Sequence, residues 1–287
     1  MAKGRELKGR IKSVENTRKI TRTMEMVATS KMKRATDRVA AARPYANALG
    51  DMLGHLYSSD LAQQFPLLRR PKHTKTVALL LITANRGLCG GFNANLIKEA
   101  RARIAEWEAA GITVEMHIVG KKGIGFFKYL GKPIVSQHTD ITDKPSAADA
   151  ARLVDGLMTR FAAGELDAVY VTSTKYKSAL TAPPGTTAVL PVTPPTGVGA
   201  TRDFLLAPSG AKILEALLPA YVRNAVYRSL AEAEAGFQSA QRTAMKNATD
   251  NATDLLQVYK RTYNTARQAQ ITQEIAEIVG GAAALQG

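Results

Sequence analysis

The sequence predicts an α/β fold in which a compact module stands between two long terminal helices that pair antiparallel as a coiled coil. Three observations lead to this prediction: a helical repeat at each end of the chain, few helix breakers within either repeat, and an alternation of apolar strands with helices between them. With 287 residues, the chain is long enough for one compact domain and an appendage. The predicted segments are an N-terminal coiled-coil helix at 1–60, an α/β module at 70–195 and a C-terminal coiled-coil helix at 209–287.

The N-terminal helix is predicted from Leu7 to about His55, where Pro44 is the only proline. Apolar, small and a few polar residues recur at alternating spacings of four and three, which is the heptad spacing of a coiled coil. These seam positions are Leu7, Ile11, Val14, Arg18, Thr21, Glu25, Ala28, Met32, Ala35, Val39 and Ala42. A second apolar stripe lies beside the seam and consists of Ile20, Met24 and Val27.

The middle of the chain alternates between strands and helices. Thr76–Ala84 is a short, wholly apolar run, which is typical of a strand buried on both faces. Ser146 and Asp149 form the pattern of a capping box at the start of a helix. Such an alternation predicts a mostly parallel sheet covered by helices. Further strands are expected at 112–119, 134–137, 167–174 and 186–192, and helices at 94–110, 122–130 and 146–163.

The C-terminal helix is predicted from Ser209, which acts as its cap, to Leu285. It therefore begins before Pro219, which is expected either to kink the helix or to mark a restart. Gly280 and Gly281 loosen its last turn. The residues that sustain the repeat are Leu230, Ala233, Phe237, Ala240, Ala244, Ala248, Leu255, Val258, Ile271, Ile275, Ile278 and Val279.

Two very long helices at opposite ends of the chain have one economical arrangement, in which they lie antiparallel with the module on one side. Ala, Ser and Thr at many seam positions allow close approach but bury little apolar surface. The outer surface of the helix pair is therefore expected to contact other molecules.

Positive charge is concentrated at the N-terminus. The net charge is +15, and residues 1–43 hold 13 Lys or Arg against four acids. Such a helix attracts acidic proteins, anionic lipids or nucleic acid. Residues 1–43 contain no aromatic side chain to stack on bases, and known nucleic-acid-binding motifs are missing, so an acidic protein is favoured. A basic coiled-coil adaptor that binds nucleic acid or an anionic membrane remains the strongest alternative.

No catalytic, metal or cofactor site emerges from the motifs. Asn85–Asn93 lies where phosphate-binding loops occur, yet neither it nor Gly120–Gly125 matches a nucleotide-binding motif, so structural turns are favoured over a nucleotide-binding enzyme. Cys89, the lone cysteine, is interpreted as a small buried residue, and its solitude favours a reducing compartment. No apolar stretch is long enough to span a bilayer, and the N-terminus lacks the features of a secretory signal. The histidines His55, His73, His117 and His138 are scattered without metal-ligand spacing.

Three segments resemble the gamma subunit of F-type ATP synthases. Ile11–Pro44, IKSVENTRKITRTMEMVATSKMKRATDRVAAARP, is similar to its N-terminal helix. Thr83–Asn93, TANRGLCGGFN, is similar to its strand-to-helix turn, and Tyr263–Ala284, YNTARQAQITQEIAEIVGGAAA, to its C-terminal helix. The order and spacing of the segments match, and the likeness covers essentially the whole chain.

The resemblance implies a non-catalytic rotary shaft with a Rossmann-like α/β module. Its partners would be three alpha and three beta subunits, the epsilon subunit and the membrane c-ring, with no nucleic acid and no cofactor. The subunit would be peripheral to the membrane, on the cytoplasmic face of a bacterial inner membrane. The shaft would couple ion flow through the c-ring to ATP synthesis or hydrolysis on the alpha/beta ring.

The resemblance also implies the contact residues. It places Arg267, Gln268 and Thr272 at a polar contact with a beta-subunit loop. It places acidic loops of the beta subunits near Met24 and the surrounding cations Arg22, Lys31, Lys33 and Arg34. The end of the C-terminal helix is expected to be an apolar bearing tip, because Ile271–Leu285 has two acids and no base. The tip residues are Ile271, Ile275, Ile278 and Val279.

Two features limit the resemblance. Plastid relatives carry a redox insert with cysteines, which a chain with Cys89 alone cannot reproduce. The region around Asp203–Pro208 is less distinctive, so no c-ring contact is assigned to it.

Overall fold

The computed structural model describes residues 2–57, 64–193 and 209–286 and divides the chain into two compact units. The first unit consists of Met1–Ala28 and Arg242–Gly287, and the second of Thr29–Gln241. Two long helices, α1 (Ala2–Leu56) and α6 (Gly210–Gln286), contribute residues to both units. Both predicted terminal helices are therefore confirmed, whereas the region around Asp203–Pro208 lies outside the described residues.

Neither internal proline ends its helix. Pro44 lies inside α1 and Pro219 inside α6. The predicted start of α6 is also confirmed, because the amide of Lys212 donates to the Ser209 hydroxyl oxygen at 3.3 Å. The interpretation of Pro219 as a restart is wrong, since the α-helix is continuous from Gly210 onward.

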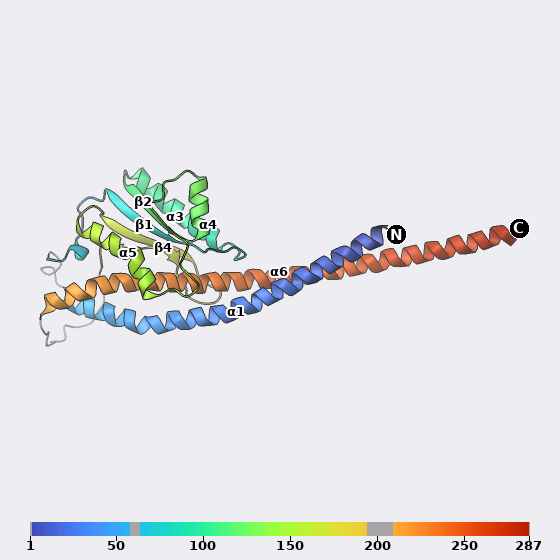
Figure 1. Cartoon of the computed structure of the whole chain (residues 1–287), viewed down its shortest axis with the longest axis horizontal. Coiled ribbons are helices and arrows are strands. Elements are labelled where there is room, and N and C mark those ends of the chain that lie inside the picture. The colour runs from blue at the N-terminus through green and yellow to red at the C-terminus, as the bar shows by residue number, and fades with distance from the viewer. Residues whose placement is uncertain (1, 58–63, 194–208, 287) are drawn as a thin grey trace. The chain divides into compact units, whose positions relative to one another are not determined.

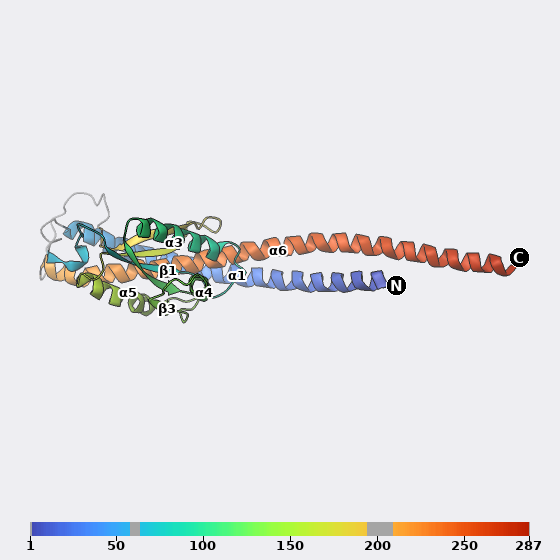
Figure 2. The same ribbon diagram turned by 90° about the horizontal axis from the view of Figure 1, so that it is seen from above.

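The first unit is an antiparallel helix pair. The Thr249 hydroxyl donates to the Thr21 hydroxyl oxygen at 2.8 Å, and Lys260 forms an ion pair with Glu15 at 3.4 Å. A later residue of α6 thus meets an earlier residue of α1, as antiparallel pairing requires. Figures 1 and 2 both show the last turns of α6 continuing past the start of α1. The buried residues of this unit include Thr21, Ala28, Met245, Thr249, Ala252 and Leu256.

The second unit contains a five-stranded sheet in the order β3-β2-β1-β4-β5. Its strands are β1 (Thr76–Ile82), β2 (Thr113–Val119), β3 (Ser136–His138), β4 (Ala168–Thr174) and β5 (Pro184–Leu190). The β1–β2, β1–β4 and β2–β3 pairs are parallel, and β4–β5 is antiparallel. The predicted mostly parallel sheet is confirmed; the antiparallel edge strand follows from the short β4–β5 connection, which is too short for a crossover.

Helices cover both faces of this sheet. The face of β1 that carries Leu79 and Leu81 packs against α3 (Phe92–Ala109) and α4 (Lys121–Tyr129). The face that carries Leu80 and Ile82 packs against α5 (Ala147–Ala162) and against α1 and α6 residues of the same unit. The prediction of a central strand buried on both faces is therefore confirmed. The 3-10 helix η1 (Pro66–Leu68) contributes Leu68 to the core on the Leu80 and Ile82 face.

Inside the second unit, α1 and α6 approach each other through small side chains. Ala35 and Val39 of α1 form a buried cluster with Ala231 and Ala235 of α6. Tyr176, from the loop that joins β4 to β5, packs against this cluster. Small residues at the contact let the two backbones lie close, as the seam composition predicts.

The predicted capping box of α5 is present. The Ser146 hydroxyl oxygen accepts from the amide of Asp149 at 3.1 Å, and the Asp149 carboxylate accepts from the amide of Ser146 at 2.9 Å. Within the described ranges, no helix combines the length and apolar character needed to cross a bilayer.

Candidate functional site

The end of α6 exposes apolar side chains without a partner among the described residues. Ile271 is 43% exposed, Ile275 56%, Ile278 71% and Val279 61%. A helix that lay in its own core would bury such residues, because each buried side chain of this size contributes about 1.5–3 kcal/mol. The residues that the structure describes therefore leave this apolar tip largely uncovered.

The two acids of the tip are hydrogen-bonded along the helix. Gln270 donates to Glu274 at 2.8 Å, and Gln273 donates to Glu277 at 2.9 Å. These pairs lie one turn apart on an exposed helix surface, so they hold the carboxylates on the helix. The surface of the tip therefore consists of isoleucines and of carboxylates that already accept hydrogen bonds from glutamines of the same helix.

Arg267, Gln268 and Thr272 also lie on the surface of α6. All three are exposed. The Thr272 hydroxyl donates to the backbone carbonyl of Gln268 at 2.9 Å, so this bond does not involve the Gln268 side-chain amide. Arg267 precedes Ile271 by one helical turn, and Gln268 precedes Thr272 by one turn. Polar groups and the apolar tip are thus contiguous on one helix.

Met24 lies apart from that cluster. It is half-buried on α1, within one turn of Thr21, which contacts Thr249 of α6. Arg267 lies further along α6 than Thr249 by about 27 Å of helix at 1.5 Å per residue. The structure therefore places Met24 and Arg267 at separate positions of the first unit.

The second apolar stripe of α1 is exposed. Ile20 is 60% exposed and Val27 is 51% exposed, whereas Met24, between them, is partly covered. The predicted heptad seam, in contrast, is half-buried or buried at every position from Leu7 to Ala42. The sequence pattern thus separates the face that pairs inside the chain from a face that is exposed among the described residues.

The cations predicted around Met24 belong to different units. Arg22 is an exposed residue of the first unit. In the second unit, Lys31 forms an ion pair with Asp143 at 2.8 Å and Lys33 forms one with Asp37 at 2.8 Å. The Arg34 guanidinium donates to the Ser30 hydroxyl at 3.1 Å.

The loop Asn85–Asn93, the candidate for phosphate binding, is closed by its own contacts. Asn93 accepts from the amide of Ala84 at 2.9 Å, and Asn85 accepts from the amide of Lys121 at 3.1 Å. Phe92, the first residue of α3, packs edge to face on Phe237 of α6 with centroids 5.6 Å apart. The start of α3 therefore packs against α6, which favours the structural interpretation of this turn.

The second glycine-rich segment, Gly120–Gly125, is also a close-packed turn. Gly120 has a φ of 96°, and a Cβ atom there would lie 2.2 Å from the carbonyl oxygen of Thr83. The Thr83 hydroxyl accepts from the amide of Gly123 at 3.0 Å. Glycine is required here because β1 and the start of α4 approach each other closely.

Cys89 is buried, as the sequence interpretation predicts. Asn93 donates to its sulfur at 3.2 Å, and burial raises the pKa of the thiol. A protonated, enclosed thiol is a poor nucleophile. No cluster of His, Cys, Asp and Glu suited to a metal ion occurs in the part of the chain that the structure describes.

Two of the scattered histidines contact the same serine in the sheet, which sequence reasoning did not detect. The Ser136 hydroxyl lies 2.7 Å from His117 Nδ1 and 3.2 Å from His138 Nε2. Burial lowers the pKa of His117 to about 4, so the imidazole is neutral at neutral pH. The parallel register of β2 and β3 brings these residues together, and no spacing in the sequence signals it.

Comparison with known proteins gives the family context of these surfaces. A family model described as "ATP synthase" matches residues 3–285. The chain is 76% identical over its whole length to a protein named "ATP synthase gamma chain" from Gemmatimonas aurantiaca, and it covers that protein completely. It is 46% identical, over 99% of its length, to a protein of the same name from Leptospira biflexa, which it also covers completely.

Solved structures share the fold at low sequence identity. The Tetrahymena thermophila mitochondrial ATP synthase, in its central stalk and c-ring structure, gives a TM-score of 0.63 at 24% identity, covering 80% of this chain and 99% of that one. The Euglena gracilis mitochondrial ATP synthase, in an OSCP/F1/c-ring structure, gives a TM-score of 0.71 at 18% identity. The match covers 99% of this chain and 95% of that one. A rotor structure of the Euglena gracilis mitochondrial ATP synthase gives a TM-score of 0.68 at 19% identity. That match covers 94% of this chain and 99% of that one.

Proposed function

Because the chain belongs to the family of ATP synthase gamma chains, we propose that it is the central rotary shaft of an F-type ATP synthase. The shaft couples ion flow through the membrane c-ring to ATP synthesis or hydrolysis on the alpha/beta ring. It carries no catalytic site of its own. Its role is mechanical, since rotation of an asymmetric helix pair presents a different surface to each surrounding catalytic site.

The observation that carries this proposal is the unpartnered apolar tip of α6. Ile271, Ile275, Ile278 and Val279 are all exposed, although a soluble helix normally turns such residues inward. An apolar surface forms few directional bonds, so it turns inside an apolar sleeve without a preferred angle. A ring of alpha and beta subunits around the tip supplies such a sleeve.

Arg267, Gln268 and Thr272 are proposed as a catch for one beta-subunit conformation. They lie beside the apolar tip and are exposed, so their side chains are available to a partner loop. Hydrogen bonds to a charged group are directional and contribute about 1.5–3 kcal/mol, which is enough to distinguish two loop positions. The same contacts break when the loop moves.

Met24 and its basic surroundings are proposed to face acidic loops of the beta subunits. Met24 lies between the exposed side chains of Ile20 and Val27, and Arg22 is exposed in the same unit. Exposed ion pairs contribute about 0–1 kcal/mol each, so a surface of this kind attracts acidic loops and still slides past them.

The proposed assembly contains three alpha and three beta subunits, an epsilon subunit and the c-ring. The chain is peripheral to the cytoplasmic face of a bacterial inner membrane and is a subunit of a proton-translocating ATP synthase. The net charge of +15 supports contact with acidic protein partners.

Co-purification from the native membrane tests the proposal. An affinity-tagged full-length chain is expected to bring down alpha and beta subunits and ATPase activity, whereas the chain purified alone is expected to hydrolyse no ATP. Recovery of the chain from the membrane without alpha and beta subunits would defeat the proposed function. A salt-sensitive complex with nucleic acid in their place would favour the adaptor alternative.

A further inference from the structure

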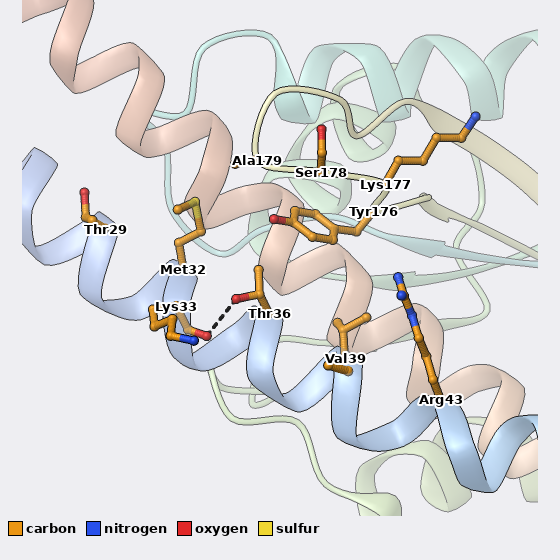
Figure 3. Close-up of a pocket in the computed structure, with 11 residues that line it drawn as sticks. Thr29, Met32, Lys33, Thr36, Val39, Arg43, Tyr176, Lys177, Ser178 and Ala179 are labelled. Atoms are coloured by element: carbon orange, nitrogen blue, oxygen red, sulfur yellow. Dashed lines mark hydrogen bonds between the residues drawn. The ribbon is translucent and has the colours of Figure 1, made fainter.

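A groove of about 660 Å³ lies between α1 and the loop that joins β4 to β5. All of its lining residues belong to the second unit. Figure 3 shows Met32 of α1 beside the Tyr176 ring and Val39 below it, so apolar side chains form the interior of the groove. Lys33, Arg43 and Lys177 also line it.

The loop side of this groove is held in place by α6. The amide of Tyr176 donates to the Glu232 carboxylate at 3.3 Å, and the Ser239 hydroxyl donates to the carbonyl of Ala179. Glu232 is itself buried and accepts from Arg228 at 2.7 Å. Because two hydrogen bonds fix the loop to the helix at separate points, the groove exists before any partner binds, and binding does not have to order it.

The cations around the groove differ in whether they form ion pairs within the chain. Lys33 is engaged by Asp37 at 2.8 Å. Arg43 and Lys177 are exposed and form no ion pair within the described ranges. In Figure 3 the Arg43 guanidinium extends from α1 toward the loop that carries Tyr176, whereas the Lys177 amine extends outward. An apolar interior with two available cations complements a ligand that combines carboxylates with an apolar side chain.

We propose that this groove docks an acidic peptide segment of a partner protein. One apolar side chain of the segment enters between Met32 and Tyr176, and its carboxylates pair with Arg43 and Lys177. A small anion would contact the cations and leave the apolar interior exposed. A flat membrane surface would not fill a groove of this volume. The docking site lies in the second unit and goes beyond the proposed shaft function, which assigns nothing to this loop.

Photo-crosslinking in the assembled complex tests the proposal. The photoreactive amino acid p-benzoylphenylalanine replaces Ala40, an exposed residue of α1 that lines the groove. Irradiation of native membranes, followed by mass spectrometry of the adducts, is expected to identify a partner peptide with more acids than bases. Arg43→Glu combined with Lys177→Glu is expected to lower the adduct yield about tenfold, which corresponds to two lost ion pairs.

A matched control separates the local effect from the change in net charge. Lys98→Glu combined with Lys128→Glu changes the charge equally at exposed positions of α3 and α4, and it is expected to leave the yield unchanged. If the double groove variant does not assemble, the wild-type yield is measured against sodium chloride and is expected to fall as screening increases.

Four results would overturn the docking site: a lipid adduct, an adduct on a neutral or basic peptide, no adduct with a partner, or a yield indifferent to both charge reversal and salt. Co-purification with alpha and beta subunits is scored separately in the same preparation. A failed docking site is therefore distinguishable from a failed shaft function.

Discussion

Met24 shows how a single side chain is placed between the inside of a helix pair and its surroundings. Its neighbours on the same stripe, Ile20 and Val27, are more than half exposed, while Met24 is partly covered. A thioether at such a position is flexible and polarisable and makes no directional bond. This chemistry fits a contact that has to be made and released repeatedly.

Met24→Lys is expected to impair coupling between ATP hydrolysis and ion transport. A lysine here adds an ammonium group opposite the proposed acidic loops, and the new ion pair holds the shaft at one angle. The measurement is ATP-driven ion pumping in inverted membrane vesicles, compared with ATP hydrolysis in the same vesicles. Met24→Leu keeps an apolar side chain and is the control. Unchanged pumping in Met24→Lys would sink this assignment.

His117 illustrates how the sheet enforces a protonation state. The imidazole is buried against Ser136 and faces Glu115, Arg160 and His138, and burial lowers its pKa to about 4 from an ordinary value near 6.5. The folded protein therefore binds fewer protons at this site than the unfolded chain between these two values. Because protonation then favours the unfolded chain, the free energy of unfolding is highest above about pH 6.5 and decreases as the pH falls toward 4.

His117→Asn is expected to make the free energy of unfolding depend less on pH between pH 6.5 and 4. The measurement is urea unfolding of the purified chain at several pH values, followed by the fluorescence of Trp107, the only tryptophan, which lies in the same core as β2. His73→Asn, at an exposed position, is the control. An identical pH slope in His117→Asn and in the wild type would show that this histidine is not the source.

At the scale of an element, α6 is positioned on the sheet by a glycine. A Cβ atom at Gly236 would lie 2.6 Å from Thr174 Cγ2 and 3.5 Å from the Phe92 ring. The helix can therefore approach the end of β4 only with a glycine at this position. A glycine inside a helix ordinarily costs about 0.5–1 kcal/mol relative to alanine, so its presence here indicates that the close contact outweighs that cost.

Gly236→Ala is expected to destabilise the second unit by about 1–3 kcal/mol, because the methyl group forces α6 and β4 apart. Gly156→Ala is the matched control, since Gly156 lies inside α5 and a Cβ atom added there would meet nothing within 4 Å apart from the adjacent residues and the backbone of its own helix. The control is expected to stabilise the protein by about 0.5–1 kcal/mol. Urea unfolding measures both free energies. Equal effects of the two substitutions would contradict the packing argument.

The tip of α6 is an element that we propose contacts other chains. Replacing Ile275 and Ile278 together by aspartate is expected to change the stability of the purified chain by less than about 0.5 kcal/mol, because both side chains are exposed. In the assembled enzyme the same change is expected to lower ATP hydrolysis, since charges would enter an apolar sleeve.

Thermal unfolding of the purified chain and ATPase assays of the complex measure the two effects of the tip substitutions. The double valine variant at Ile275 and Ile278 keeps the apolar surface and is the control. A large loss of stability in the isolated chain would show instead that the tip belongs to a core.

At the scale of the whole molecule, the two units are stabilised by different amounts of buried surface. The second unit has two extensive apolar cores on the faces of its sheet. The first unit buries mainly small or polar seam residues, among them Thr21, Ala28, Thr249 and Ala252. Because helices of this kind rely on packing for stability, the first unit is expected to open more easily.

Hydrogen exchange followed by mass spectrometry tests this difference in the purified full-length chain. Amides of α6 between residues 242 and 260 are expected to exchange faster than those of β1 and β4. Their exchange is also expected to slow in the assembled complex, where partners cover the helix pair. Equal protection of helix and strands in the isolated chain would refute the difference.

Much of this fold is readable from the sequence because its signals are local and periodic. The heptad positions from Leu7 to Ala42 are buried or half-buried as predicted, and the capping box at Ser146 is present. The apolar run at β1 is buried on both faces. The α6 seam is less predictable: Leu255 and Val258 are exposed, while Thr249 and Leu256 are buried, because a small-residue seam gives a weak apolar signal.

The sequence by itself determined the two long helices, the alternating module and the apolar end of α6, because periodicity and composition act within one or two helical turns. Only the tertiary structure decided which side chains from distant segments meet: Thr21 with Thr249, His117 with Ser136 and His138, and the β4–β5 loop with α6. These contacts depend on strand register and on close packing of backbones, which leave no spacing in the chain. The open faces of α1 and α6 are what remains once that internal packing is complete, and they are the surfaces assigned to partners.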